Sequence, residues 1–377
     1  CLVFKKVTKN SNSCGSQEGL GDLSSQISVG STEEESEVPP REVKVREKYD
    51  KAIESFFLPV LAYYEQNHWR PLVYEVDILS KIDWGKANFQ NIFDIALSKE
   101  ETKDTESIAT INDADKLEEK STINTKNGQI DIDPVFFCRQ IIDIVPNPWM
   151  AFGFAEKVIC GFSKKHSKKS LKNNFVYIIE ETKKILQSER DRLAQQVFYS
   201  QIDVGKIRLL VIGKDLGFRL PRNYSIETKS YKLTKENRDP IQQSLYDFVP
   251  EDELNEMEKS VAWFLDDQKE LFFWYRNQVR KDYFVQGWKP QKVYPDFIFT
   301  KAEDDQINEI YVVETKGIQL QGNEDTKYKT DLFDLCNKKS FKQDPNGFVL
   351  KYNTTNISYR VIYGDQWKNK LNELFSY

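Results

Sequence analysis

Two short apolar runs in the last third of the chain predict a β-hairpin, and this hairpin constrains the fold more than any other feature. The first run covers residues 297–300 and the second covers residues 310–313, with a polar turn expected at residues 303–308. Antiparallel pairing of the runs places the start of the first strand beside the end of the second. Asp296, which precedes the first run, is therefore expected to face Glu314, which follows the second.

The residues that follow the second run predict a charged cluster at this end of the hairpin. Side chains alternate along a strand, so Glu314 and Lys316 should project from the same face. Thr315 should point away and offer only its backbone carbonyl, and Gly317 follows where the chain must leave the sheet. Two carboxylates and a carbonyl suit a hard cation such as Mg²⁺, and an adjacent ammonium can orient a water molecule and offset charge on a phosphorane. A metal-dependent phosphodiesterase can be built on such a hairpin, although the same pattern also arises by chance in a chain with 30% charged residues.

A third carboxylate, Glu258, is expected on the apolar side of an amphipathic helix. Between Glu253 and Asp266, apolar residues recur at helical spacing, namely Leu254, Met257, Val261, Phe264 and Leu265. A carboxylate on that side is costly unless it pairs, accepts hydrogen bonds or binds a metal. Two interpretations stay open: a functional acid beside the hairpin, or a residue at the edge of the stripe that pairs with Lys259 or Arg280.

Composition excludes several classes of protein. The 377 residues are 39% hydrophobic, which is enough for two compact domains and a tail. No apolar stretch is long enough to span a bilayer and no signal peptide is recognisable, so a soluble cytoplasmic protein is predicted. Five scattered cysteines without CxxC spacing support neither a disulfide framework nor a zinc or iron–sulfur site. Two histidines are too few for a histidine-rich metal centre, and no GxxxxGK[ST] or strand-linked GxGxxG marks a nucleotide site.

Positive charge is concentrated in one segment. The formal net charge of −5 argues against a uniformly basic surface for nucleic acid, but a local basic patch would be enough. A Ser-rich segment with little apolar content gathers six cationic or titratable side chains, namely Lys164, Lys165, His166, Lys168, Lys169 and Lys172. This segment is predicted to be flexible, and it either follows the phosphates of a nucleic acid or is an ordinary solvated loop.

Composition shifts along the chain predict three parts. Residues 1–42 are rich in Ser, Gly and Glu and are interpreted as a low-complexity linker or the truncated end of an upstream domain. Residues 43–243 are expected to form a mixed α/β connecting domain, with a polar insertion near residues 99–129. Residues 244–377 alternate helical and strand patterns in an order typical of an α/β sandwich, a mixed sheet flanked by helices.

Local patterns predict individual elements in the two larger parts. In the connecting domain we expect a helix from Val43 towards Pro59, a buried strand over Pro71 to Leu79, a rigid turn at Pro146 to Trp149 packed by its indole, a helix over Val176 to Val197 and a buried strand over Ile207 to Ile212. In the last part, besides the helix with Glu258 and the hairpin, we expect strands at residues 271–275, 347–352 and 357–363, a helix at residues 325–341 and a closing helix.

Several motifs of the chain resemble one family. Tyr294-Pro295-Asp296 and Glu314-Thr315-Lys316-Gly317 are similar to the signature of PD-(D/E)XK nucleases, in the form found in the C-terminal region of restriction subunits of type III restriction enzymes and related helicase-nucleases. The resemblance covers most of the chain after Val43 and is strongest from Ser244 to Lys329. Its other segments are Glu75 to Ile78, Pro146 to Trp149, Glu258 to Ala262, Trp274 to Asn277, Gln286 to Trp288 and Gly322 to Lys329.

The resemblance implies a role for each matching residue. Asp296 and Glu314, with the Thr315 carbonyl, would hold Mg²⁺, Lys316 would be the catalytic lysine, and Glu258 would be the acidic residue on the helix. Three further residues would face DNA: Arg276, Lys327 and Tyr328. The family's ATP-driven motor is missing from this chain, so ATP would act only through an upstream motor that the chain lacks.

The sequence supports two main hypotheses of function. The first is a Mg²⁺-dependent DNA endonuclease module that hydrolyses phosphodiester bonds, with an ATPase motor and a methyltransferase subunit as implied partners. The second is a catalytically silent module that binds DNA or assembles with a separate motor or methyltransferase subunit. A third and weaker interpretation, the residue of a broken gene that folds poorly, would be contradicted by cooperative melting.

Overall fold

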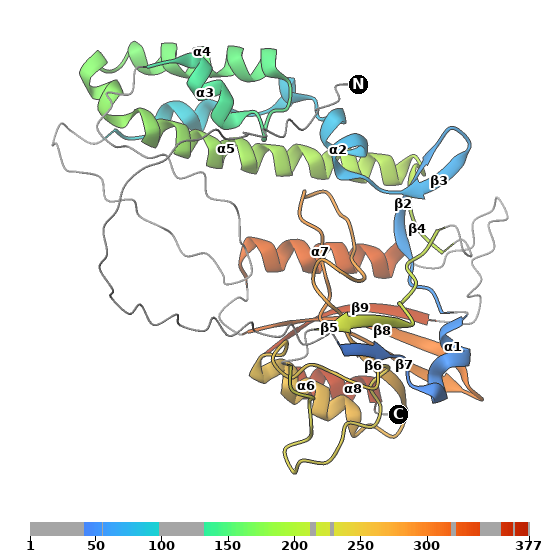
Figure 1. The fold of residues 1–377 in the computed structure, drawn as a ribbon. Coiled ribbons are helices and arrows are strands. Elements are labelled where there is room, and N and C mark those ends of the chain that lie inside the picture. Colours follow the sequence, from blue (N-terminus) through green and yellow to red (C-terminus); the bar gives the residue numbers. More distant parts are fainter. Residues whose placement is uncertain are drawn as a thin grey trace, which may run out of the picture. The chain divides into compact units, whose positions relative to one another are not determined.

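A four-stranded mixed sheet forms the centre of the C-terminal part of the chain (Figure 1). Its strands follow the order β6 (Leu271–Arg276), β7 (Phe297–Glu303), β8 (Gln306–Lys316) and β9 (Asn356–Tyr363). The first three pair antiparallel, whereas β8 and β9 pair parallel. Parallel neighbours cannot be joined by a tight turn, so the chain crosses between them through α7 (Glu324–Lys339). The predicted hairpin, the aromatic strand before it and the strand after α7 are confirmed.

The structure is a computed structural model that describes residues 41–54, 56–97, 132–211, 216–226, 230–317, 322–339, 356–364 and 366–375. Nearly all of the predicted linker at residues 1–42, the polar insertion at residues 99–129 and the strand expected at residues 347–352 lie outside the described residues. The described residues belong to one compact unit, Pro40–Tyr377. Within these ranges, none of the helices is both long enough and apolar enough to cross a lipid bilayer.

A two-residue turn closes the hairpin between β7 and β8. Asp304 and Asp305 adopt φ angles of 47° and 60°, and Glu303 pairs with Gln306 directly before and after them. Turns with two positive φ values match the twist of paired strands, and aspartate tolerates this region of φ and ψ better than most residues. The turn is therefore shorter than the predicted one. At the other end of the hairpin, Phe297 pairs with Val313, which brings the start of β7 beside the end of β8.

Helices cover both faces of the sheet. On one face, α6 (Glu256–Asp266) and α8 (Trp367–Phe375) share a hydrophobic cluster with alternate strand residues: Val261, Leu265, Leu271, Trp274, Phe297, Phe299, Val313, Ile362 and Leu371. On the other face, α7 contributes Leu332 and Phe333, and the Phe333 ring lies 5.5 Å from the Tyr359 ring. The other strand residues of this face belong to the same cluster: Phe273, Tyr275, Ile298, Ile310, Val312 and Ile357. This alternation follows from the two-residue period of a strand. The C-terminal part is thus an α/β sandwich, as predicted.

The preceding part of the chain combines small sheets with helices. β1 (Arg41–Lys44) pairs with β5 (Asn223–Ile226), and β2 (Val60–Glu65) pairs with both β3 (His68–Pro71) and β4 (Ile207–Leu210). Three longer helices, α3 (Pro134–Ile141), α4 (Pro148–Ser163) and α5 (Lys168–Asp203), pack on one another. The short helices are η1 (Glu47–Tyr49), α1 (Asp50–Glu54), α2 (Tyr74–Asp77), η2 (Leu79–Lys81), η3 (Trp84–Lys86) and η4 (Gln90–Asp94). The predicted helix over 176–197 and the strand that begins at Ile207 are confirmed.

Two predicted elements near the N-terminal side differ from the structure. Residues 47–54 of the helix expected from Val43 are helical as η1 and α1, but its expected start belongs to β1, because Val43 pairs with Tyr224 in a segment far along the chain. The strand expected over residues 71–79 ends at Pro71, and the residues that follow form α2. Proline cannot donate to a strand ladder, and the buried Asp77 accepts hydrogen bonds from the Val73 amide at 2.8 Å and from the Arg70 guanidinium at 2.6 Å.

Two predictions around α4 also differ from the structure. The motif at Pro146 to Trp149 starts a helix: the Asn147 side chain accepts hydrogen bonds from the Trp149 and Met150 amides, and proline occupies the first turn. The Trp149 indole is 86% exposed, so it packs no turn. The lysine-rich segment is only in part a loop: Lys164, Lys165 and His166 lie between the end of α4 at Ser163 and the start of α5 at Lys168, whereas Lys168, Lys169 and Lys172 lie in α5. The Ser167 hydroxyl accepts a hydrogen bond from the Ser170 amide at the start of α5.

The hydrophobic core extends across residue 243, the expected boundary between the two larger parts. The Tyr283 hydroxyl donates to the Pro59 carbonyl at 2.7 Å, and the rings of Phe198 and Trp288 lie 5.6 Å apart. Both contacts join residues from the two sides of that boundary. α5 and the segment before β7 are therefore held together by buried side chains.

Candidate active site

Asp296 lies directly before β7, between the ends of β6 and β8. Its amide donates to the Val313 carbonyl at 2.9 Å, and its own carbonyl accepts from the Asn277 amide at 2.9 Å. Since Phe297 pairs with Val313, the antiparallel register places Asp296 opposite Glu314, as the hairpin predicts. The sheet itself therefore brings these two carboxylates together.

Thr315 holds the Asp296 carboxylate with two hydrogen bonds. The Thr315 amide donates to Asp296 Oδ2 at 2.6 Å, and the Thr315 hydroxyl donates to the same oxygen at 2.7 Å. The expectation that Thr315 offers only its backbone carbonyl is therefore wrong, because Asp296 precedes the paired part of β7 and reaches the Thr315 side chain. Thr315 therefore donates to Asp296 Oδ2 alone, and Oδ1 accepts no hydrogen bond from it.

Glu314 is buried and contacts two ammonium groups through one oxygen. Its side chain is 3% exposed, and Oε1 lies 3.0 Å from Lys316 Nζ and 2.8 Å from Lys329 Nζ. The second oxygen, Oε2, is buried without a hydrogen-bond partner. Burial raises the pKa of the Glu314 carboxyl, the nearby Asp296 carboxylate raises it further, and the two ammonium groups only partly oppose them.

Glu258 faces the same region from α6 and pairs with Arg276. Its Oε1 accepts from Arg276 Nη2 at 2.8 Å, and its Oε2 accepts from the Asn255 amide in a capping box at the start of the helix. Glu258 therefore pairs with a basic side chain, but the partner is Arg276 and not Lys259 or Arg280, the two residues expected. Lys259 pairs instead with Glu251 and Glu256. Burial raises the pKa of the Glu258 carboxyl although Arg276 acts to lower it.

Arg276 is an internal bridge and not a surface contact for DNA. Besides Glu258, its Nη1 donates to the carbonyls of Asn277 at 2.7 Å and Asp296 at 3.1 Å, and it lies 3.7 Å from Asp296 Oδ1. Its side chain is largely buried by these partners. Arg276 therefore connects the Glu258 carboxylate to the backbone of Asp296.

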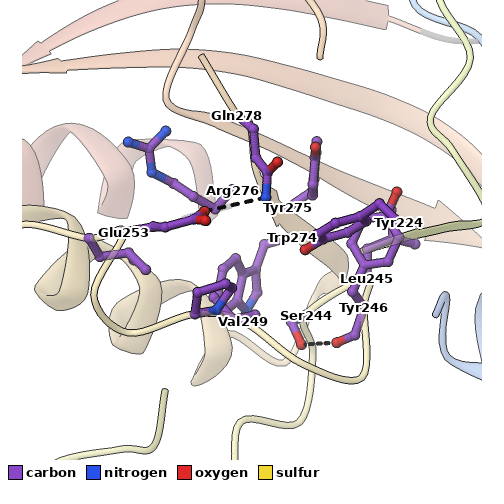
Figure 2. A pocket seen from close by; sticks show the side chains of 12 residues that line it. Tyr224, Ser244, Leu245, Tyr246, Val249, Glu253, Trp274, Tyr275, Arg276 and Gln278 are labelled. Atoms are coloured by element: carbon purple, nitrogen blue, oxygen red, sulfur yellow. Dashed lines mark hydrogen bonds between the residues drawn. The ribbon is translucent and has the colours of Figure 1, made fainter. Parts of the chain in front are cut away.

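A small cavity lies beside Arg276, lined by the side chains drawn in Figure 2. Trp274 and Tyr275 form part of its wall, and the Gln278 amide donates to the Glu253 carboxylate at 3.3 Å. The free volume is ≈ 10 Å³, about the space that one water molecule needs. This cavity therefore cannot admit a nucleobase.

The remaining candidates lie in different environments. Lys327 is exposed on α7, whereas Tyr328 is only 4% exposed and its ring packs edge-on against Trp288 at 4.9 Å. Tyr328, expected to face DNA, is thus a core residue that packs against the segment before β7. Its hydroxyl fits against Gly287, where a Cβ atom would lie 2.5 Å away.

Four lysines around the α4–α5 connection are exposed. Lys164, Lys165, Lys168 and Lys169 contribute to no ion pair among the described residues. Lys165 donates to the Phe93 carbonyl at 3.0 Å. We call these four lysines the basic corner.

Lys329 is the site residue that the sequence did not single out. It lies four residues after Asp325 on α7, and its ammonium lies 3.4 Å from that carboxylate as well as contacting Glu314. This spacing predicts an ordinary helical ion pair. No local signal distinguishes Lys329 from Lys327, because only the packing of α7 on the sheet directs one of them towards Glu314.

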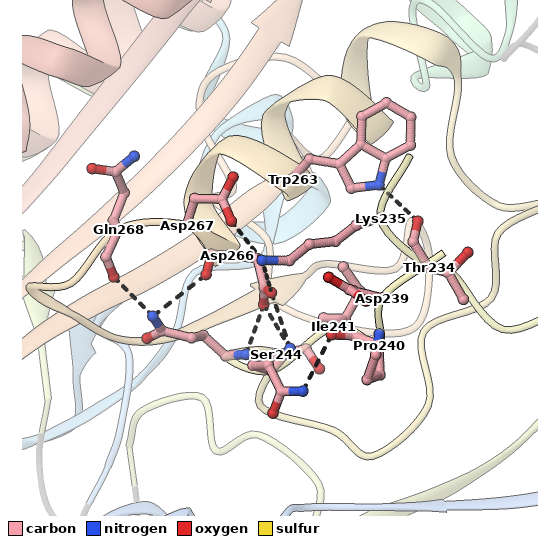
Figure 3. A network of polar contacts seen from close by, with 12 residues as sticks. Thr234, Lys235, Asp239, Pro240, Ile241, Ser244, Trp263, Asp266, Asp267 and Gln268 are labelled. Carbon is pink, nitrogen blue, oxygen red and sulfur yellow. Dashed lines mark hydrogen bonds and ion pairs between the residues drawn. The ribbon is translucent and has the colours of Figure 1, made fainter. Parts of the chain in front are cut away.

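A second buried acid on α6 has a structural role. Asp266 accepts hydrogen bonds from the Gln242 and Gln243 amides and from the Trp274 indole at 3.0, 2.6 and 3.1 Å. Lys235 Nζ lies 3.3 Å from its second oxygen (Figure 3). These partners satisfy the carboxylate, so Asp266 ties α6 to β6 and the preceding segment.

The donor set near Asp296 and Glu314 suits Mg²⁺. Within the described ranges, His, Cys, Asp and Glu side chains form no group of three or more arranged to hold a metal ion. Mg²⁺ in proteins commonly binds through one or two carboxylates and completes its shell with water and substrate phosphate oxygens. The two carboxylates and the partnerless Glu314 Oε2 fit this mode of binding. No protein-family model, curated protein or solved structure matches the chain.

Proposed function

We propose that the chain is a Mg²⁺-dependent DNA endonuclease module that hydrolyses phosphodiester bonds. One observation carries the proposal: Asp296 and Glu314 lie close enough for one carboxylate to raise the pKa of the other, and Glu314 Oε2 is buried without a donor. Two such carboxylates favour a divalent cation, which relieves their repulsion and satisfies the open oxygen.

Each charged residue then has a distinct part in the proposed reaction. Asp296, fixed by Thr315, and Glu314 would hold Mg²⁺, together with the Thr315 carbonyl. Lys316, adjacent to Glu314, would orient the water that attacks phosphorus in line. Bound Mg²⁺ would supply charge neutralisation at the non-bridging and leaving 3′ oxygens. Glu258 would act as a positioning residue, since Arg276 links it to Asp296.

The order of elements supports a PD-(D/E)XK arrangement for the C-terminal part. A helix, three antiparallel strands, a crossover helix and a parallel strand follow one another, and the Pro-Asp and Glu-Thr-Lys motifs occupy adjacent ends of β7 and β8. The motifs also resemble those of type III restriction subunits. This resemblance is the basis for proposing an ATPase motor and a methyltransferase subunit as partners, and a cytoplasmic location.

Cleavage of plasmid DNA by the purified chain tests the proposal. We expect nicking or linearisation with Mg²⁺ and none with Ca²⁺ or EDTA, with or without a separately supplied motor. Asp296→Asn and Lys316→Met should reduce the rate by at least about 100-fold while the melting transition is kept. Asp305→Asn, at the far end of the hairpin, is a matched control because asparagine also tolerates its positive φ. Unchanged cleavage by Asp296→Asn would contradict the proposal.

The charge balance of the site favours one alternative, a catalytically silent module that binds DNA or assembles with a separate motor or methyltransferase subunit. Glu258 is neutralised by Arg276, and Glu314 by Lys316 and Lys329, so the cluster can exist as a structural network. Titration with Mg²⁺ distinguishes the two functions. The silent module would retain DNA without cutting it and would bind no Mg²⁺ at this site.

A further inference from the structure

Two lysines from different elements share one oxygen of Glu314. Lys316 comes from the same strand, two residues further along, whereas Lys329 reaches over from α7. Lys329 makes the shorter contact, 2.8 Å against 3.0 Å, and both ammonium groups approach Oε1 and not Oε2. Glu314 thus has two ammonium partners, and Lys329 is the one that also pairs with a second carboxylate, Asp325, at 3.4 Å.

A purely structural role explains this arrangement poorly. The contacts of Tyr328, Leu332 and Phe333 in the core already attach α7 to the sheet. A buried ion pair is seldom more stabilising than an apolar pair of similar volume. If Lys329 served only to satisfy the Glu314 carboxylate, its ammonium would be expected to donate to Oε2. That oxygen is buried and has no hydrogen-bond partner.

We propose that Lys329 neutralises Glu314 so that Lys316 can leave that carboxylate and act on the scissile phosphate and its attacking water. This inference rests on the proposed function. Lys329 is then a positioning residue that acts through Glu314 and does not touch the reacting atoms. Its ammonium stands close to the proposed metal ligands, so it also opposes the approach of a divalent cation.

This role predicts opposite effects on metal binding and on cleavage. Replacing Lys329 by methionine removes the charge and keeps most of the apolar stem. Without Lys329, Lys316 becomes the sole cation that pairs with Glu314, so it is less available for the reaction. At the same time the repulsion of the incoming cation falls. A side chain that merely holds the site together would weaken both properties when removed.

The experiment uses the full chain in three variants. Mg²⁺ and Ca²⁺ affinities are measured by calorimetry, and plasmid cleavage is measured under single-turnover conditions with Mg²⁺. For Lys329→Met we expect metal binding about 3- to 10-fold tighter and cleavage at least about 10-fold slower. Lys329→Arg should restore part of the rate. Lys338→Met, an exposed lysine on the same helix, should match the unaltered chain in both measurements.

The possible outcomes separate this inference from the proposed function. Weaker metal binding together with slower cleavage, in a variant with a native melting transition, would overturn the role of Lys329. Unchanged values in both measurements would overturn it as well. If the unaltered chain binds Mg²⁺ but does not cut DNA, the proposed function fails, and tighter binding by Lys329→Met would still support the opposition between this lysine and the cation.

Discussion

Arg276 Nη2 lies 2.8 Å from Glu258 Oε1, and this ion pair joins the first turn of α6 to the end of β6. Both side chains are largely buried. Arg276 also donates to the Asp296 carbonyl, so the pair contacts the backbone of the first carboxylate of the candidate site. A helix outside the hairpin therefore adds support to the position that the hairpin gives Asp296.

Loss of the Glu258 carboxylate should destabilise the fold. In Glu258→Ala, Arg276 becomes a buried charge without its closest carboxylate, and the capping box is lost. We expect the free energy of unfolding to fall by about 3 kcal/mol, measured by urea denaturation. Glu256→Ala is the matched control, because this residue lies in the same turn with its side chain 88% exposed. A change within about 0.5 kcal/mol is expected there, and equal losses in both variants would contradict the interpretation.

Asp266 should matter for stability but not for metal binding. In Asp266→Asn the new amide group faces donors from Gln242, Gln243 and Trp274, and at least one buried donor loses its acceptor. We expect a loss of about 2 kcal/mol in the free energy of unfolding and an unchanged Mg²⁺ affinity. Asp267→Asn tests the exposed neighbour that also pairs with Lys235. A changed Mg²⁺ affinity in Asp266→Asn would show that Asp266 acts on the site.

Metal binding should strengthen as the pH rises. Burial and Asp296 raise the pKa of Glu314 above its ordinary value of 4.5, so the folded chain keeps this proton to higher pH than the unfolded chain. Ionisation of this group therefore lowers the free energy of unfolding as the pH rises from about 4.5 through the raised pKa. A divalent cation binds the ionised form and competes with the proton.

Calorimetric titration with Mg²⁺ between about pH 5 and 8 measures this competition. We expect the affinity of the unaltered chain to rise across the range, and we expect Glu314→Gln to bind Mg²⁺ weakly at every pH. An affinity that does not depend on pH would show that Glu314 is not a ligand, or that it is ionised throughout the range.

The basic corner should contribute to DNA affinity. Replacing Lys164, Lys165, Lys168 and Lys169 by glutamine removes four exposed cations, two of them in the first turn of α5, where cations also oppose the helix dipole. If these lysines contact phosphates, the slope of log affinity against log salt should fall by up to about 0.9 per lost contact. Fluorescence anisotropy with duplex DNA at several salt concentrations measures the slope. Lys183→Gln with Lys184→Gln is the control, since both lysines pair with glutamates on the same helix.

A methyl group at position 287 should disturb the packing of α7. A Cβ atom there would lie 2.5 Å from the Tyr328 hydroxyl and 3.0 Å from a Leu332 methyl group. We expect Gly287→Ala to lower the free energy of unfolding by about 1 to 3 kcal/mol. Gly153→Ala is a control of opposite sign, because no atom lies within 4 Å and alanine favours the interior of a helix by about 1 kcal/mol. Thermal melting of both variants should show a lower melting temperature for Gly287→Ala and a higher one for Gly153→Ala.

Local patterns in the sequence were enough for the elements that carry the candidate site. The helix with Glu258, the strand that follows it and the hairpin follow from residue periodicity, because amphipathic elements have a fixed period of about 2 or 3.6 residues. The pairing of Asp296 with Glu314 follows from the hairpin alone, since an antiparallel register is determined by the turn. These contacts are local in sequence.

Contacts between distant segments required the tertiary structure. β1 forms because residues 223–226 offer a partner strand, and the region after Pro71 turns helical around the Arg70–Asp77 ion pair. Arg276 was expected to face DNA but lies between Glu258 and Asp296. Lys329 joins Glu314 only because α7 packs on the sheet at that angle. The sequence alone determines which residues share a strand or helix face, whereas the charge that each carboxylate meets depends on how separate elements pack, and periodicity carries no information about that packing.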